Sequence, residues 1–164
     1  MIRTLALILL AGPAWAQDPY APFVASVEPC LARADDAATA RACIGIGARD
    51  CMETAPDGQT TVGMMFCQLA ERDVWERLLA VELAAAQQRA VLSDDAERPY
   101  HPEFAQRTAQ LEDSQRAWLA YRGAQCAMEY GAWGAGSMRQ IAGADCQLRL
   151  TAARVVDLTL YLAD

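Results

Sequence analysis

The sequence predicts an all-α protein, an antiparallel bundle of three main helices preceded by short helices that disulfides clip together. Three observations predict this class. Apolar residues recur at helical spacing through the second half of the chain. No run of alternating β-branched residues and no hairpin dipeptide occurs. Six cysteines are present in 164 residues, an even number that suits crosslinked short elements.

The first 16 residues have the composition of a secretory leader. Arg3 precedes the apolar run LALILLAG, which is too short to span a bilayer, and Ala14-Trp15-Ala16 places small residues before Gln17. No cysteine follows at the spacing of a lipid anchor, and no second long apolar run occurs. We therefore expect cleavage near Ala16/Gln17, a periplasmic or secreted product, and no membrane insertion after cleavage.

All six cysteines follow the leader, where an exported chain meets oxidising conditions. Metal ligation is the competing interpretation. It is disfavoured because no CxxC pair occurs and the only histidine, His101, is far from any cysteine. The motif CxxCH is also absent, so no covalent haem is expected. Among the possible pairings we favour the local one: Cys30–Cys43, Cys51–Cys67 and Cys126–Cys146.

Residues 17–50 are expected to form an N-terminal appendage with short helices. Three prolines make its start extended or irregular: Pro19, Pro22 and Pro29. The alanine-rich run from Cys30 to Met52 predicts one or two short helices, interrupted at Gly45 and Gly47.

Two long helices are expected next. The loop TAPDGQTT ends in Thr60 or Thr61, and either can cap a helix from about Val62 to Leu92. The helix after it should reach Tyr130 and has the clearest periodicity in the chain. An apolar row repeats every seven residues: Phe104, Leu111 and Trp118. A polar row with the same repeat accompanies it: Thr108, Gln115, Arg122 and Glu129.

Glycines then stop that helix, and Ser137 is expected to cap the last one. The apolar stripe of the last helix is Ile141, Ala144, Leu148, Thr151, Val155, Leu158 and Leu162. The segment between the two helices allows two interpretations. It is either an ordinary turn or a tethered loop that presents an aromatic residue and an arginine to a partner. The candidate binding residues are Tyr130, Trp133, Ser137, Met138 and Arg139.

Arg122 lies on the face of its helix that should be buried, one turn after Trp118 and one turn before Cys126. A guanidinium keeps its charge, so burial requires an acidic partner. The candidate partners are Asp73, Glu129 and, favoured, Glu76. Two roles remain open: an ion pair that fixes helix register, or an arginine that binds a ligand in a groove.

The charge balance narrows the classes of partner. The chain has 14 basic and 21 acidic residues, a formal charge of −7, and loss of Arg3 with the leader makes it −8. This acidity argues against nucleic acid and favours a cationic partner. No nucleophile elbow, phosphate-binding glycine motif or HExxH pair occurs, so we expect neither an enzyme nor a cofactor.

Three segments together resemble the LprI-like lysozyme-inhibitor domain: QTTVGMMFCQLAERDVWERLL, LEDSQRAWLAYRGAQC and GAGSMRQIAGADCQLRLTAARVVDL. The positions that carry the resemblance are Thr61, Met64, Cys67, Trp75, Gln115, Trp118, Tyr121, Arg122, Cys126, Gly136, Ser137, Cys146, Thr151 and Arg154. The resemblance implies a helical domain over residues 51–164. The motif core that it implies is Glu76, Gln115, Trp118, Tyr121, Arg122, Thr151 and Arg154.

The chain departs from the family pattern at three positions. Glu76 replaces an Asp and keeps its charge, whereas Ala80 and Leu83 stand where Asn and Tyr are usual. The resemblance implies inhibition of lysozyme by binding. Animal-type lysozymes are strongly cationic with an acidic cleft, so an acidic domain with a rigid loop suits them as a partner. The alternative is a non-inhibitory periplasmic interaction module.

Overall fold

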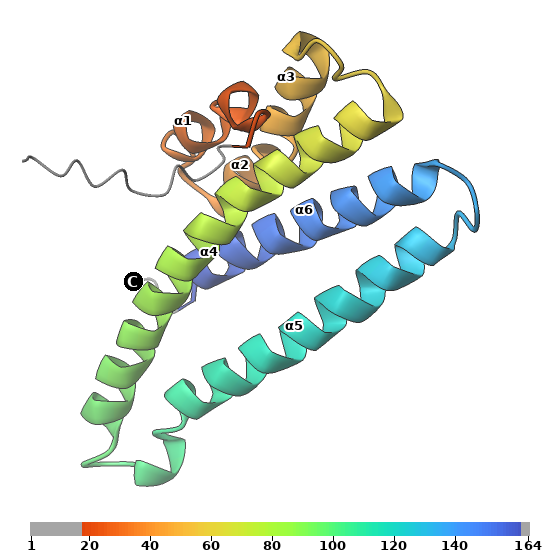
Figure 1. Cartoon of the computed structure of the whole chain (residues 1–164). Helices are drawn as coiled ribbons and strands as arrows, with labels where there is room; N and C mark the ends of the chain where they lie inside the picture. Colours follow the sequence, from red (N-terminus) through yellow and green to blue (C-terminus); the bar gives the residue numbers. More distant parts are fainter. Residues whose placement is uncertain (1–17, 162–164) are drawn as a thin grey trace, which may run out of the picture.

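The computed structural model describes residues 18–161, and those residues form helices and no strand. Three long helices dominate: α4 (Thr61–Glu97), α5 (Arg107–Gly131) and α6 (Met138–Thr159). They run alternately up and down, with α6 packed along α4 and α5 packed along α6 (Figure 1). The predicted all-α class and the three main helices are confirmed. The expected leader and Leu162 lie outside the described residues.

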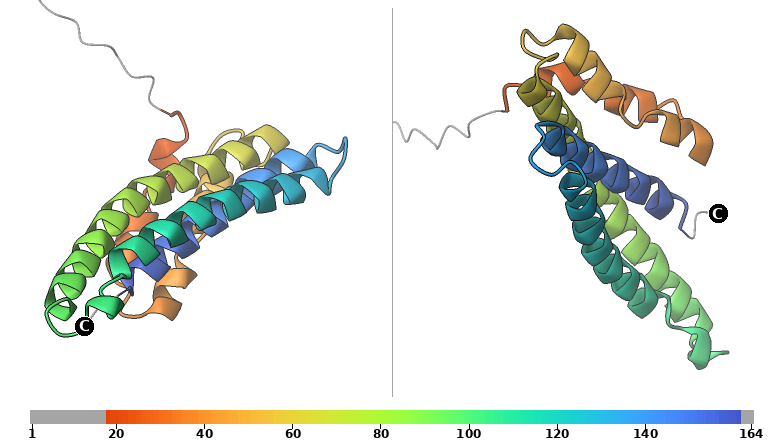
Figure 2. Two further views of the ribbon diagram at one scale, coloured as in Figure 1. Left: turned by 90° about the horizontal axis from the view of Figure 1, so that it is seen from below. Right: turned by 90° about the vertical axis from the view of Figure 1, so that its right-hand side faces the viewer.

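The N-terminal part contains a short 3-10 helix, η1 (Ala21–Val24), and three short α-helices. These are α1 (Val27–Leu31), α2 (Ala37–Ala42) and α3 (Ile46–Thr54). They lie on the side of α4 and α6 that faces away from α5 (Figure 2).

The run from Cys30 to Met52 contains two short helices, α2 and α3, as expected. The expected interruption is confirmed at Gly45 and is wrong at Gly47. Gly45 has φ of 83°, in the left-handed region that favours glycine, and it makes the turn into α3. Gly47 lies inside α3, where a Cβ would come within 2.8 Å of the Val27 side chain. It therefore permits close packing of two helices and interrupts neither.

One hydrophobic core joins the short helices to the long ones. Val27 from α1 and Ala48 from α3 are buried in the same cluster as Trp75 from α4 and Leu148 from α6. The expected boundary between residues 50 and 51 falls within α3. The N-terminal helices are thus part of the packed body.

Three disulfides link neighbouring elements, in the pairs that the sequence favours. Cys30–Cys43 joins α1 to the end of α2, Cys51–Cys67 joins α3 to α4, and Cys126–Cys146 joins α5 to α6. Each closes a loop of 13 to 20 residues. Closure of loops of this length stabilises a fold by about 3 kcal/mol each, largely through the unfolded chain.

The first long helix begins where the sequence predicts but ends later. The Thr60 hydroxyl accepts a hydrogen bond from the Gly63 N–H at 2.9 Å and caps α4. The helix continues past Leu92 to Glu97, because no glycine or proline occurs between Leu92 and Pro99.

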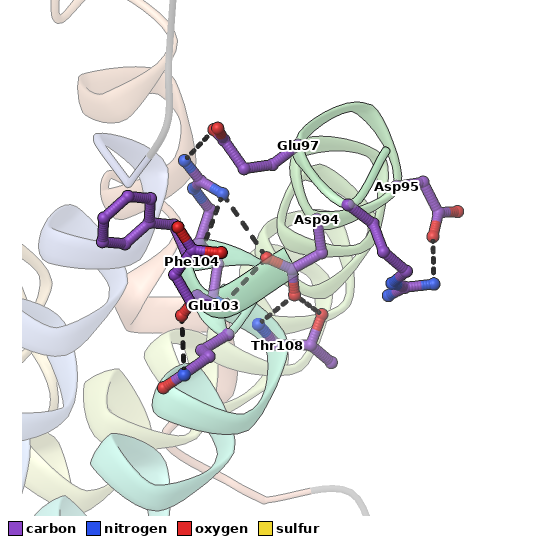
Figure 3. Close-up of polar contacts among 9 residues, drawn as sticks. Asp94, Asp95, Glu97, Glu103, Phe104 and Thr108 are labelled. Carbon is purple, nitrogen blue, oxygen red and sulfur yellow. Dashed lines mark hydrogen bonds and ion pairs between the residues drawn. The ribbon is translucent and has the colours of Figure 1, made fainter. Parts of the chain in front are cut away.

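A carboxylate on α4 caps the start of α5. The buried Asp94 accepts hydrogen bonds from the backbone N–H groups of Arg107 and Thr108, both at 2.9 Å, and from the Thr108 hydroxyl at 2.8 Å (Figure 3). Gln106, at the N-cap position of α5, makes no capping bond of its own. Burial acts to raise the pKa of Asp94, but the hydrogen bonds from Thr108 and Arg107 outweigh it and lower the pKa to about 2. Asp94 therefore fixes where α5 begins.

Phe104 is not part of the periodic helix, contrary to the prediction. It belongs to the 3-10 helix η2 (Pro102–Phe104), and 62% of its surface is exposed. The chain reverses between α4 and α5 in this segment, and α5 starts only at Arg107. The predicted apolar row is therefore reduced to Leu111, which is buried, and Trp118, which is partly buried.

A second carboxylate on α4 caps α3. Glu71 is fully buried, and its two oxygens accept the backbone N–H groups of Gly45 at 2.8 Å and Ala48 at 2.7 Å. The same side chain accepts the indole N–H of Trp75 at 2.8 Å. Three donors thus satisfy a buried charge that has no cationic partner among the described residues.

An arginine on α4 binds the C-terminal end of a helix. The Arg89 guanidinium donates to the carbonyl oxygens of Leu158 at 2.8 Å and Tyr161 at 2.9 Å, at the C-terminus of α6. Carboxylates at helix N-termini and a cation at a C-terminus match the sign of the helix dipole. The charged side chains of α4 thereby set the positions of three other helices.

Candidate functional site

The motif residues gather where α4, α5 and α6 meet, around Arg122. Its Nη1 donates to the Glu76 carboxylate on α4 and to the Thr151 hydroxyl on α6, the latter at 2.8 Å. The guanidinium also lies over the Trp118 ring, 4.7 Å from its centroid. The favoured partner, Glu76, is therefore the one that Arg122 contacts.

The other two candidate partners are engaged elsewhere. Asp73 pairs with Arg72, next to it in sequence, and Glu129 accepts from Arg149 at 2.8 Å. The structure supports the ion-pair role of Arg122, which ties three helices together.

Arg154 on α6 occupies the neighbouring position. It donates to Gln115 at 3.0 Å and to Ser114 at 3.2 Å, and its guanidinium lies 5.9 Å from the Trp118 ring centroid. Burial lowers the pKa of Arg154, and the carboxylate of Asp157 opposes that shift. Trp118 therefore has a guanidinium from α5 and another from α6 beside it.

Six of the seven motif residues meet in this cluster: Glu76, Gln115, Trp118, Arg122, Thr151 and Arg154. Tyr121 does not, because it points outward and is exposed. Ser114 joins the cluster without having been predicted. It stands one helical turn before Trp118, and that spacing is the only signal in the sequence that could have identified it.

A shallow groove of about 380 Å³ lies on the surface between α5 and α6, beside this cluster. Arg122, Tyr130 and Gln147 line it, together with the buried disulfide cysteine Cys126. The groove leads from the motif cluster toward the turn between the two helices, so Arg122 borders an open space although its charge is paired.

The turn between α5 and α6 exposes most of the predicted loop residues. Trp133 is 50% exposed, and Tyr130 and Met138 are each 40% exposed. Arg139 is partly buried and lies over the Tyr130 ring at 5.5 Å. Ser137 stands at the N-cap position of α6 as predicted, but its hydroxyl makes no capping bond.

The turn is held at its base by covalent and close contacts. The Cys126–Cys146 disulfide joins the helices on either side of it. At Gly143 a Cβ would come within 3.1 Å of the Tyr130 ring, so glycine lets that ring pack on α6. Gly134 makes the reversal itself with φ of 51°. The turn is thus anchored while Trp133 projects from it.

The exposed surface that continues from this turn along α5 carries no charge. Between Ala117 and Met138, the two charged residues, Arg122 and Glu129, are partly buried and ion-paired. We call the remainder the uncharged face. Its exposed residues are Ala117, Leu119, Ala120, Tyr121, Gly123, Ala124, Ala127, Met128, Tyr130, Gly131, Ala132, Trp133, Gly134, Ala135, Gly136, Ser137 and Met138.

Such a surface is unusual on an acidic chain in which 21% of residues are charged. Large exposed apolar patches on soluble proteins often serve protein–protein contacts, which makes this face a candidate contact surface. The sequence does contain the signal, since Arg122 and Glu129 are the only charged residues between Arg116 and Arg139.

Residues 18–161 contain no group of three or more His, Cys, Asp or Glu side chains placed to hold a metal ion. Within the same range, each helix is too short or too polar to cross a membrane.

Comparison with known families gives a match for the part of the chain that contains the three long helices. The family model described as lysozyme inhibitor LprI matches residues 51–158, from within α3 to near the end of α6. Comparisons with curated proteins and with solved structures gave no match. Because the family model covers more than half of the sequence and includes the whole motif cluster, this chain belongs to the LprI lysozyme-inhibitor family.

Proposed function

We propose that this protein is an exported inhibitor of lysozyme that acts by binding the enzyme and performs no chemistry of its own. Family membership is the observation that carries the proposal. Three disulfides together with this family indicate an extracytoplasmic protein. We further propose that the leader is cleaved near Ala16/Gln17 and that the product acts in the periplasm or outside the cell.

The charge of the chain suits a cationic lysozyme. With the formal charge of −7, or −8 after loss of Arg3, the domain attracts a cationic partner at long range and accelerates the encounter. Charge of this sign also disfavours nucleic acid as a competing partner.

The uncharged face, with the turn at its end, is the proposed contact surface. Tyr130, Trp133 and Met138 are exposed side chains of the types that dominate binding energy in interfaces. Because the Cys126–Cys146 disulfide anchors the turn, ordering it on binding costs little conformational entropy. Desolvation of this face buries no unpaired charge, since its two charged neighbours are paired within the domain.

The test is the rate at which a cationic lysozyme clears a peptidoglycan suspension, with and without the purified mature domain. Wild-type protein should slow clearing at micromolar concentration. Trp133→Ala should weaken inhibition by about tenfold or more, as expected for an aromatic anchor. Full inhibition by a folded Trp133→Ala variant would remove the turn from the mechanism.

Tyr100→Ala is the matched control. Tyr100 is 79% exposed and lies in the connection between α4 and α5, at the other end of α5 from the turn. Its removal should leave inhibition unchanged.

The second candidate function is a non-inhibitory periplasmic interaction module. The same uncharged face supports it, because an apolar surface does not by itself select lysozyme over another protein partner. If the wild-type domain fails to slow lysozyme at micromolar concentration, this function replaces inhibition.

A further inference from the structure

A second concave site lies on the opposite side of the molecule from α5. It is a pocket of about 380 Å³ where the segment around α2 meets α4 and the end of α6. The pocket is separated from the turn by the length of α6, 22 residues or roughly 33 Å at the helical rise. It therefore belongs neither to the motif cluster nor to the uncharged face.

The walls of the pocket are mainly apolar and come from three directions. Leu31 and Ala37 stand on the N-terminal side, Leu78 on α4, and Val156 and Leu160 on α6. A concave apolar pocket of a few hundred Å³ is the usual form of a small-molecule site in proteins.

Every charged group that lines the pocket is acidic. Asp35 and Asp36 lie at its N-terminal edge, and Glu82 projects from α4. Asp36 accepts the Thr39 N–H at 2.8 Å and caps α2, so one of its carboxylate oxygens is already engaged in a hydrogen bond. Glu82 is partly buried, and no hydrogen bond or ion pair within residues 18–161 involves it.

No arginine within residues 18–161 forms an ion pair with Glu82, including Arg33, which stands between the lining residues Ala32 and Ala34. Arg41 pairs with Asp157 at 2.9 Å, and Arg89 donates to the carbonyl oxygens of Leu158 and Tyr161. A partly buried carboxylate beside an apolar wall gains most from a ligand that supplies a positive charge together with an apolar body.

We propose that this pocket binds a small organic cation with an apolar body, of the alkylammonium class, with Glu82 facing the cationic group. The apolar part of the ligand lies against Leu78, Val156 and Leu160. The site goes beyond lysozyme inhibition and does not depend on it.

The proposal is tested by titrating the ¹⁵N-labelled mature protein with octyltrimethylammonium, followed by NMR. Saturable shifts are expected at the amides of Ala34 to Ala40, Leu78 to Glu82 and Val155 to Leu160. Octanesulfonate has an apolar chain of equal length and opposite charge, and it should bind roughly tenfold more weakly or not at all. Tetramethylammonium, which lacks the chain, should not give saturable shifts.

Two variants and one control separate the effect of the charge from that of the cavity. Glu82→Gln should reduce the preference for the cation over octanesulfonate by about threefold or more. Glu53→Gln makes the same charge change at an exposed position on α3 that does not line the pocket, and should leave the preference as it is in wild type. Ala40→Leu fills the cavity from α2 and should abolish binding of both amphiphiles while the protein stays folded.

Three results would overturn the proposal. They are the absence of saturable shifts with octyltrimethylammonium, equal binding of octanesulfonate, and an unchanged preference in a folded Glu82→Gln variant.

Discussion

The carboxylate of Asp94 on α4 holds Thr108 at the start of α5 through both the backbone N–H and the hydroxyl of that residue, at 2.9 and 2.8 Å. This contact stands in for the side-chain cap that α5 lacks. It also places the helix that carries the uncharged face. The state of one acidic group therefore affects how firmly α5 is held.

Acid should weaken this contact. Folding lowers the pKa of Asp94 from 3.8 to about 2, so the ionised group stabilises the folded state above about pH 4. That contribution is lost as pH falls through about 2. Asp94→Asn should lower Tm at neutral pH on the order of 5 °C. It should also flatten the fall in Tm between pH 4 and pH 2, as measured by circular dichroism.

Asp95→Asn is the control for this change. Asp95 is exposed and forms only a surface pair with Arg98 (Figure 3). It should change neither Tm nor its pH dependence by a measurable amount. Equal behaviour of the two variants would contradict the role given to Asp94.

Removal of Arg122 should destabilise the bundle. In Arg122→Ala the Glu76 carboxylate and the Thr151 hydroxyl both lose their donor, and Trp118 loses a packed guanidinium. The expected loss is about 1–3 kcal/mol in the free energy of unfolding, measured by urea denaturation.

The matched control is Arg116→Ala, on the same helix. Arg116 is 75% exposed and pairs only with Asp113. Its removal should cost less than about 0.5 kcal/mol. If Arg122→Ala were equally mild, the ion pair would not be what holds the three helices in register.

Replacing each of two glycines in the long helices by alanine should change the stability of the protein in opposite directions. A Cβ at Gly63 would lie 2.0 Å from the carbonyl oxygen of Asp57, which is backbone and cannot move aside. A Cβ at Gly123 meets nothing within 4 Å. Gly63→Ala should lose about 3 kcal/mol, whereas Gly123→Ala should gain about 0.5–1 kcal/mol from helix propensity. Thermal unfolding of the two variants checks both signs.

The disulfide at the base of the turn should matter to both stability and inhibition. The double variant Cys126→Ala/Cys146→Ala should lose about 3 kcal/mol of stability. It should also inhibit lysozyme less well at a temperature where it remains folded, because the turn must then be ordered on binding.

The variant Cys30→Ala/Cys43→Ala separates these two effects. That pair also closes a short loop, but it lies among the N-terminal helices. It should lose a similar amount of stability and keep full inhibition. Loss of inhibition in both variants would show that the turn has no special role.

Features that depend on local spacing could be predicted from the sequence. The helical periods defined three long helices, and neighbouring cysteines pair as expected. One contact between distant residues could also be predicted. Arg122 and Glu76 lie 46 residues apart, and Glu76 could be chosen because an arginine on an apolar helix face needs an acid on the facing helix.

Most contacts between distant parts of the chain could not be predicted from the sequence. Asp94 caps α5, which starts 13 residues later in the chain. Glu71 caps α3 by accepting the N–H of Gly45, which lies 26 residues earlier. No residue spacing marks such contacts. Phe104 fitted the seven-residue period by coincidence, because periodicity does not show where a reversal of the chain interrupts a helix. The uncharged face depends on which side of α5 stays uncovered by the other helices, and the sequence pattern does not show that.

Contact between the uncharged face and lysozyme is tested most directly by titrating the ¹⁵N-labelled mature domain with unlabelled cationic lysozyme and recording which amide signals move. Contact through the uncharged face predicts shifts concentrated between Ala117 and Met138, strongest around Trp133. Shifts confined to the N-terminal helices, or spectra that do not change at equimolar lysozyme, would contradict it.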